Sequence, residues 1–427
     1  MNYKIAGIDV HKKMLAVVIA DVAGSGEYEF ERRKFGAQPG EPRVLAEWLK
    51  EREVEEVVME STSLYWRPVW QELERSWQGE RQKREGGGEM AGFLHLAQAE
   101  SNRARQGRKG DYVDGERLVK RLVADELVLS YVPDAEQRLW RTVSRRKYQL
   151  TRDRTRMRNQ MEGLLEEAEI KLSSLVSDLF GASGRRMLKG LSEGVADAAA
   201  LAGLADRHLR ATAEELRDAL GACVDLKPMY RTLLKMSLDE LNLMEEQMEI
   251  LDRELAGMLK AHQKAVERLA AVPGLGVDSG QQIITQVGPA AATFPTARHL
   301  ASWVGVCPGR EESAEHSKSD RSPKGNRTMR RLLNQAANAA VRTKGSIFEM
   351  TYRRYVPRMG HNKAIWAIAH RLCNLIWKIL HEGISYEERG PSVCAKSQHR
   401  RAVRMIKELE NLGYRVEPQK LEAQGAR

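Results

Sequence analysis

Cysteine is scarce in this sequence, and long hydrophobic runs are missing. The four cysteines, Cys223, Cys307, Cys373 and Cys394, lie far apart and form no Cys-x-x-Cys pair. This spacing supports neither a zinc ribbon nor a disulfide framework, so we expect buried apolar side chains at these positions. No apolar run approaches the length of a membrane span, and the start lacks the charged-then-apolar layout of a signal peptide. We therefore expect a soluble, cytoplasmic protein with no membrane partner.

Basic residues outnumber acidic ones. The 427 residues include 69 Lys and Arg against 59 Asp and Glu, which gives a net charge of +10 and a pI near 9.3. This excess favours a polyanionic partner, above all nucleic acid, over an acidic small substrate. The length allows two or three domains, each with its own core.

The first hundred residues change repeatedly between strand and helix patterns. In one strand, Tyr28 and Phe30 alternate with glutamates, which is the period of a half-buried strand. The predicted strands cover residues 4–10, 15–20, 27–35, 54–59 and 93–97. One helix is predicted at residues 39–52. A second is predicted after Ser61-Thr62, and these two residues could cap its N-terminus. Three strands, a helix and a fourth strand predict an α/β domain with a ribonuclease-H-like fold.

Four acidic residues fall where this fold needs them, and these are Asp9, Glu60, Asp111 and Asp114. Asp111 and Asp114 stand three apart at the start of a predicted helix, so both would project to one side. Carboxylate oxygens suit Mg²⁺ or Mn²⁺, and a site holding two such ions can support phosphoryl transfer. The alternative is that Asp9 is a turn residue, Asp111 caps a helix and Asp114 lies on the surface.

Two long helices are predicted at residues 136–175 and 226–258. The first is strongly basic over residues 141–160, where it contains Arg145, Arg146 and Lys147. Both carry apolar residues at near-heptad steps; the seam of the second includes Leu233 and has one gap, at Ser237. Helical sequence at 183–220 joins them, which predicts an antiparallel coiled-coil arm or a dimerising coiled coil. A solvated helix face is the alternative for the basic run.

Two further segments have the character of nucleic-acid contacts. Residues 101–109 contain no acid and carry four basic residues, Arg103, Arg105, Arg108 and Lys109. The segment Val272-Pro273-Gly274-Leu275-Gly276 has the form of a helix-hairpin-helix turn, in which the glycines let the backbone approach a phosphate. A plain helix–loop–helix turn is the alternative.

Ser313 lies at the mouth of a basic loop that leads into a helix. The basic residues around it include Arg310, Lys318, Arg321, Lys324, Arg327 and Arg330. A serine becomes a phosphoryl-transfer nucleophile when a base takes its proton and cations stabilise the pentavalent phosphorus. The metal carboxylates or His316 could supply that base. The alternative is a loop serine in a phosphate-binding patch.

An amphipathic helix is predicted at 363–380, and past residue 384 we expect a loosely attached basic tail.

The acids and the serine stand within longer motifs. The first three are Gly7-Ile8-Asp9-Val10-His11-Lys12, Met59-Glu60-Ser61-Thr62-Ser63-Leu64-Tyr65-Trp66-Arg67-Pro68-Val69 and Gly107-Arg108-Lys109-Gly110-Asp111-Tyr112-Val113-Asp114. They resemble the acidic blocks of the DEDD transposases of bacterial insertion sequences, also called bridge-RNA-guided recombinases. The segments 272–276, 300–308 and 312–326 are similar to the C-terminal transposase domain of that family. Gly110 stands where a Thr is expected, and Glu315 where a Gly is common.

The resemblance implies four parts: a RuvC-like domain at 1–133, a helical coiled-coil region at 134–262, a mainly α C-terminal transposase domain at 263–384, and the basic tail at 385–427. It implies that Asp9, Glu60, Asp111 and Asp114 bind magnesium, and that Ser313 attacks DNA to form a covalent phosphoserine link. It also implies a structured noncoding guide RNA that pairs with target and donor DNA. We expect a homo-oligomer, either a dimer or a tetramer.

Three other functions are compatible with parts of this pattern. A metal-only nuclease resembling junction resolvases would use the acids and leave Ser313 to bind phosphate. An invertase-like protein would recombine DNA without a guide RNA. A non-enzymatic RNA-binding coiled-coil protein would need neither the acids nor the serine.

Overall fold

The computed structural model describes residues 3–22, 28–60, 63–78, 93–99, 110–307, 312–313, 316–317, 322–411 and 415. The chain divides into two compact units, Met1–Ala135 and Glu136–Arg427. In the described residues, no helix is long and apolar enough to cross a membrane.

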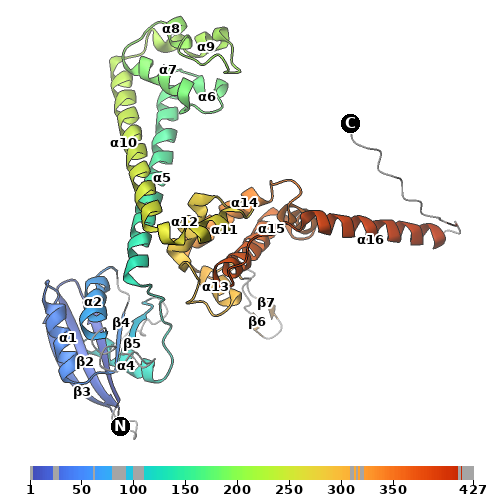
Figure 1. Cartoon of the computed structure of the whole chain (residues 1–427). Helices are drawn as coiled ribbons and strands as arrows, with labels where there is room; N and C mark the ends of the chain where they lie inside the picture. The colour runs from blue at the N-terminus through green and yellow to red at the C-terminus, as the bar shows by residue number, and fades with distance from the viewer. Residues whose placement is uncertain are drawn as a thin grey trace. The chain divides into compact units, whose positions relative to one another are not determined.

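The first unit is built on a five-stranded sheet with the order β3-β2-β1-β4-β5 (Figure 1). Its strands are β1 (Tyr3–Val10), β2 (Met14–Val22), β3 (Tyr28–Gly36), β4 (Glu56–Glu60) and β5 (Phe93–Ala97). The first three pair antiparallel, whereas β4 runs parallel to β1 and β5 runs parallel to β4. This is the arrangement of a ribonuclease-H-like sheet, and all five predicted strands are confirmed within about two residues.

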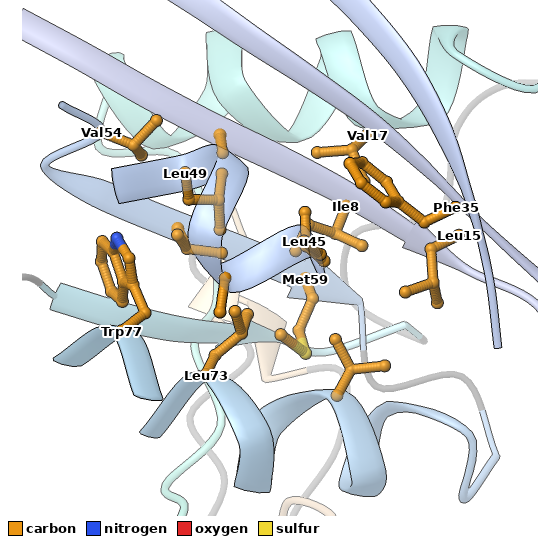
Figure 2. Close-up of a cluster of buried hydrophobic side chains, with 14 of the residues drawn as sticks. Ile8, Leu15, Val17, Phe35, Leu45, Leu49, Val54, Met59, Leu73 and Trp77 are labelled. Carbon is orange, nitrogen blue, oxygen red and sulfur yellow. The ribbon is translucent and has the colours of Figure 1, made fainter. Parts of the chain in front are cut away.

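One face of the sheet carries the larger core of this unit. Helices α1 (Glu41–Glu51) and α2 (Trp66–Glu72) and the π-helical turn η1 (Leu73–Gln78) supply side chains to it. Figure 2 shows Leu45, Leu49, Leu73 and Trp77 packed with Ile8 and Met59 from the strands. The helix after β4 was expected to begin near Ser61-Thr62, but it begins at Trp66 with Tyr65 in the cap position, so that prediction was wrong. Residues 61–62 lie outside the described residues.

The opposite face is covered by helix α4 (Val113–Val123). Its Leu118 and Val119 pack on Val58 and Val18, and they form smaller apolar clusters there. The sequence predicted a helix carrying both Asp111 and Asp114, but α4 begins at Val113 with Tyr112 in the cap position. Asp111 therefore precedes the helix, and the two aspartates do not share a helical face.

The second unit contains two long helices, α5 (Ala135–Glu167) and α10 (Pro228–Met258), which lie side by side (Figure 1). They run antiparallel, because Lys147 pairs with Asp252 while Arg158, further along α5, pairs with Glu245. The connection between them contains α6 (Leu172–Leu175), α7 (Ala182–Ser192), α8 (Ala198–Ala202), α9 (Ala213–Ala219) and the 3-10 turn η2 (Gly221–Cys223). These short helices form one apolar core with the adjoining ends of α5 and α10.

The apolar seam of α10 differs from the predicted one. Leu233 is exposed, whereas Leu234, Leu238 and Leu241 are buried. The buried face therefore runs through Leu234 and Leu238, each one residue after a position of the predicted seam. Ser237 does not interrupt this buried face. The antiparallel course of the two helices agrees with the sequence prediction, and the coiled-coil packing itself stays a prediction.

The rest of the second unit is helical. It contains η3 (Lys260–His262), α11 (Gln263–Ala270), α12 (Val277–Val287), α13 (Ala297–Val304), α14 (Arg327–Ala340), α15 (Ile347–His381) and α16 (Gly390–Asn411). Helix α15 is kinked at Gly360, whose φ of 75° is the left-handed region that glycine tolerates. Its second half is the amphipathic helix predicted at 363–380. The basic tail expected past residue 384 contains the 22-residue helix α16, and its loose attachment stays a prediction.

The predicted helix-hairpin-helix turn joins α11 to α12. Gly274 there has a φ of +83°, and a Cβ at this position would lie 2.3 Å from the carbonyl oxygen of Ala336 in α14. The turn therefore needs glycine at 274 to pack against the chain's own helix. Contact between this turn and a nucleic acid stays a prediction.

Two of the four cysteines are buried as expected. Cys223 and Cys373 are free and buried, while Cys307 is free and half-buried. The side chain of Cys394 lies outside the described residues.

Candidate metal centre and serine hairpin

Strand register brings Asp9 and Glu60 to the same end of the sheet, where the neighbouring parallel strands β1 and β4 finish. Ile8 on β1 is paired with Met59 on the parallel strand β4, so the next residue of each strand is an acid. Ile8 and Met59 point into the core under α1 and α2. Side chains alternate along a strand, so Asp9 and Glu60 point to the other face, which α4 covers.

A close contact between two glycines brings Asp114 to this end of the sheet. A Cβ on Gly7 would lie 2.3 Å from the carbonyl oxygen of Gly115, and a Cβ on Gly115 would lie 3.1 Å from the carbonyl oxygen of Gly7. Helix α4 can approach β1 this closely only because both residues lack a side chain. Gly7 is two residues before Asp9 on the same face of the strand, and Gly115 follows Asp114. The contact thus places the two aspartates on adjoining backbones.

Arg117 connects two of the acids. Its guanidinium donates to Asp114 Oδ1 at 2.6 Å and lies 3.5 Å from Glu60 Oε2. Arg117 was not among the residues predicted for this site. The spacing of Asp114 and Arg117 could have revealed it, because an acid and an arginine three residues apart on a helix are neighbours.

Asp9 is 9% exposed, and its carboxylate lies 2.9 Å from His11 Nε2. Burial raises the pKa of Asp9 above its usual value, and the negative charge of Asp114 adds to the rise, while His11 and Arg117 oppose it. This pattern describes a carboxylate among other acids with too little positive charge nearby to offset its burial.

Asp111 is paired with a lysine of the sheet. Its exposed carboxylate accepts a hydrogen bond from Lys34 on β3, which lowers the pKa of Asp111. Lys34 is paired with Ala16, and Ala16 with Asp9, so Lys34 stands two strands away from Asp9 in the same row of the sheet. At a strand spacing of about 4.8 Å, the two backbones are roughly 10 Å apart.

The acids have suitable chemistry for a divalent cation, because hard oxygen donors are the ligands of Mg²⁺ and Mn²⁺. In the residues that the structure describes, however, no three His, Cys, Asp or Glu side chains stand close enough together to hold a metal ion. Two cationic side chains contact members of this set: Arg117 contacts Glu60 and Asp114, and Lys34 binds Asp111.

Ser313 lies in a short hairpin of the second unit. Strands β6 (Glu312–Ser313) and β7 (His316–Ser317) pair antiparallel, with Ser313 opposite His316. Residues 308–311, 314–315 and 318–321 lie outside the described residues, as do the side chains of the hairpin itself. The backbone register therefore makes His316 the cross-strand neighbour of Ser313.

The chain on the two sides of this hairpin is tied together by Arg330 of α14. Arg330 Nη1 donates to the carbonyl oxygens of Gly305 and, at 3.1 Å, Pro323, and its guanidinium stacks over Trp366 at 4.6 Å. Gly325 lies against the end of α13, where a Cβ would be 2.3 Å from the carbonyl oxygen of Val304. The guanidinium predicted to bind nucleic acid is thus hydrogen-bonded to the protein's own backbone, and its contact with nucleic acid stays a prediction.

The other predicted nucleic-acid contacts are distributed unevenly. Arg145, Lys324 and Arg327 are exposed, and the exposed Arg146 donates to Gln247 at 3.3 Å. Lys147 is 9% exposed and pairs with Asp252 and Asp278, so its ammonium is enclosed between helices and does not offer a contact. Arg103, Arg105, Arg108, Lys109, Arg310 and Arg321 lie outside the described residues.

Comparison with known proteins finds two family matches in one chain. Residues 6–170 match the model of the DEDD transposases of IS110 type, and residues 266–353 match the model described as "Transposase IS116/IS110/IS902 family". Together they span more than half of the 427 residues. The first contains all four acids, and the second contains Ser313, Gly305 and Arg330.

Individual relatives agree with these matches. An insertion element IS110 protein of Streptomyces coelicolor is 28% identical over 36% of this chain, which spans 37% of that protein's length. A probable family 20 transposase of Pseudomonas aeruginosa is 25% identical over 66% of this chain and 75% of its own. An insertion element IS900 protein of Mycobacterium paratuberculosis is 26% identical over 43% of this chain and 46% of its own. By the two models and these relatives, the chain belongs to the IS110/IS116 family of DEDD transposases.

Proposed function

We propose that this protein is a DNA transposase that cuts and rejoins the strands of an insertion sequence. The observation that carries the proposal is the gathering of Asp9, Glu60 and Asp114 at one end of a ribonuclease-H-like sheet, through strand register and the contact between Gly7 and Gly115. In the proposal, these acids and Asp111 hold Mg²⁺ or Mn²⁺. The metal supplies positive charge that stabilises the attacking and leaving oxygens of phosphoryl transfer.

Ser313 is the proposed nucleophile. Its Oγ attacks the phosphorus of a phosphodiester, a bond from phosphorus to serine forms, and the bond to one sugar oxygen breaks as that oxygen takes up a proton. Attack by a sugar hydroxyl of another strand reverses these steps and restores the serine. No net hydrolysis is needed, because the phosphate bond is kept as the protein–DNA link. The hairpin register supports His316 as a candidate acceptor of the serine proton.

Two variants test the chemistry. In Ser313→Ala the covalent protein–DNA adduct should disappear on denaturing gels, and strand exchange with it. In Asp9→Asn, Mg²⁺-dependent cleavage should fall by orders of magnitude while DNA binding persists. Cleavage at the wild-type rate in Ser313→Ala would instead make the protein a metal-only nuclease, and adduct formation unchanged in Asp9→Asn would remove the acids from the mechanism.

The proposal includes a structured noncoding RNA that pairs with the donor and target DNA. It is supported by the family membership and by a net charge of +10, which suits a large polyanion. The test is to sequence the RNA that co-purifies and to measure recombination with and without it. Equal recombination without RNA would make the protein an invertase-like recombinase.

The proposed assembly is a homodimer or homotetramer in which α10 of one copy packs on α10 of another. Four apolar residues of α10 repeat at seven-residue steps and are 49% to 66% exposed, namely Met229, Met236, Leu243 and Ile250. A strict seven-residue apolar repeat complements an identical repeat on a second helix, which favours a second copy over an unrelated partner. Light scattering should report a dimer or tetramer that Met236→Lys with Leu243→Lys dissociates. A monomer at working concentration would refute the assembly.

A further inference from the structure

A groove of about 650 Å³ lies between α5 and α14 in the second unit. It is lined by three arginines, Arg152, Arg156 and Arg331, against one acid, Asp153. Except for Tyr148, the remaining lining side chains are threonine, asparagine and glutamine. The groove is therefore basic and rich in hydrogen-bonding groups. It has almost no apolar side chain of the kind that a protein partner or an apolar ligand would require.

The α5 side of the groove carries exposed positive charge. Arg152 and Arg156 are four residues apart on one helix face, which separates their Cβ atoms by about 6 Å. Both are exposed, and Arg156 lies 3.5 Å from Asp153, a long contact that leaves most of its side chain in solvent. Arg145 lies seven residues before Arg152, on the same face, so the charge continues along the helix beyond the groove.

The α14 side presents a fixed planar group. The guanidinium of Arg331 lies 4.1 Å from the centre of the Tyr148 ring. It also donates to Gln335 at 3.2 Å and to Gln282 at 3.1 Å. These contacts fix the guanidinium in place beside the Tyr148 ring instead of leaving it to rotate in solvent. A stacked arginine and tyrosine form the kind of surface on which an unpaired base stacks.

We propose that this groove binds a single-stranded segment of nucleic acid. Arg152 and Arg156 contact its phosphates, and a base stacks against the pair of Arg331 and Tyr148. The proposal deepens the proposed function, on which it rests, by assigning a strand-binding site made of residues separate from the acids and from Ser313. Neighbouring residues of α14 then have different tasks: Arg330 holds the chain around the serine hairpin, and Arg331 faces the bound strand.

The test uses the full-length protein freed of bound nucleic acid, in EDTA, with one labelled 20-nucleotide sequence as single-stranded RNA, single-stranded DNA and duplex DNA. In Arg152→Gln with Arg156→Gln, single-strand affinity should fall at least tenfold. The slope of log affinity against log salt should shrink by about 1.4, because two phosphate contacts are lost. The control is Lys235→Gln with Arg253→Gln, which removes two exposed charges from α10. Equal weakening by both doubles, or no weakening by the first, overturns the proposal.

Arg331→Lys tests stacking separately from charge. The lysine keeps the positive charge but lacks the planar guanidinium on which a base can stack. Single-strand affinity should therefore fall about tenfold, while the slope of log affinity against log salt stays unchanged. Loss on both RNA and DNA single strands supports recognition of backbone and base, and loss on RNA alone supports an added contact to the ribose hydroxyl. Loss confined to duplex DNA would overturn a single-strand site. Because binding is measured without metal, failure here leaves the cleavage tests on Asp9 and Ser313 unaffected.

Discussion

The acids of the first unit and the serine hairpin of the second differ in what fixes their positions. Asp9, Glu60 and Asp114 lie on regular strands and a helix, and paired backbones and the contact of Gly7 with Gly115 set their places. Ser313 lies on a two-residue strand, and the chain beside it is tied down by Arg330. The acids are thus positioned by secondary structure, and the chain beside the serine is positioned by one side chain. The two should respond to different mutations.

The largest effect is expected from Gly7→Ala. The new methyl would lie 2.3 Å from the Gly115 carbonyl oxygen, which belongs to backbone and cannot rotate away. Helix α4 must move off β1, and stability should fall by about 1–3 kcal/mol. Mg²⁺-dependent cleavage should fall roughly 100-fold, because displacements of about 1 Å at a reacting centre have effects of that size. Thermal unfolding and cleavage rates on the same preparation measure both.

Two other glycines provide a graded control. Gly115→Ala meets its nearest atom at 3.1 Å and should show a weaker form of the same loss, whereas Gly163 on α5 has nothing within 4 Å. Gly163→Ala should leave cleavage unchanged and stabilise its helix by about 0.5–1 kcal/mol. Equal activity in all three variants would show that close packing of α4 on β1 does not position the acids.

An intermediate effect is expected from Arg330→Lys. The lysine cannot keep both carbonyl contacts and the stacking on Trp366, so the chain on either side of the hairpin loses its tie. Hydrogen bonds from a charged group contribute about 1.5–3 kcal/mol each, which predicts at least a tenfold slower formation of the covalent adduct. Because the charge is retained, the salt dependence of DNA binding should not change. Arg342→Lys, at an exposed residue just past the end of α14, is the matched control; if it slows the adduct equally, the tie has no special role.

The sequence was sufficient to predict what depends on periodicity. The five strands and the two long helices follow from alternation and from heptad spacing. The strands and the second long helix lie within about two residues of the predicted bounds, whereas the first was predicted to reach residue 175 and ends at Glu167. Asp9 and Glu60 were predictable for the same reason, because each ends an apolar strand. Helix boundaries that depend on competition between local hydrogen bonds could not be predicted from the sequence. Helix α4 begins two residues after Asp111, which bonds to Lys34 on a strand distant in sequence.

Side-chain pairing across distant segments was also outside the reach of the sequence. Lys147 belonged to a basic run typical of a nucleic-acid contact, but Asp252 and Asp278 arrive beside it from α10 and α12 and enclose it. Arg330 was predicted to bind nucleic acid, yet carbonyl groups on both sides of the hairpin accept its hydrogen bonds. A charge pattern predicts the sign of a surface, and the tertiary fold decides which of its members remain on that surface.

The smallest effect is expected from Lys34→Met. This variant concerns Asp111, which precedes α4 and lies on no strand or helix. If Asp111 joins the metal site, Lys34 competes with the metal for its carboxylate. Solvent screens an exposed ion pair, so removing the lysine should lower the half-saturating Mg²⁺ concentration for cleavage only by a few-fold. Arg52→Met is the control, because it breaks a pair with Glu31 on the same strand as Lys34. An unchanged Mg²⁺ requirement in Lys34→Met, or the same shift in both variants, would leave Asp9, Glu60 and Asp114 as the only acids of the site. The metal centre would then depend entirely on strand register and the glycine contact.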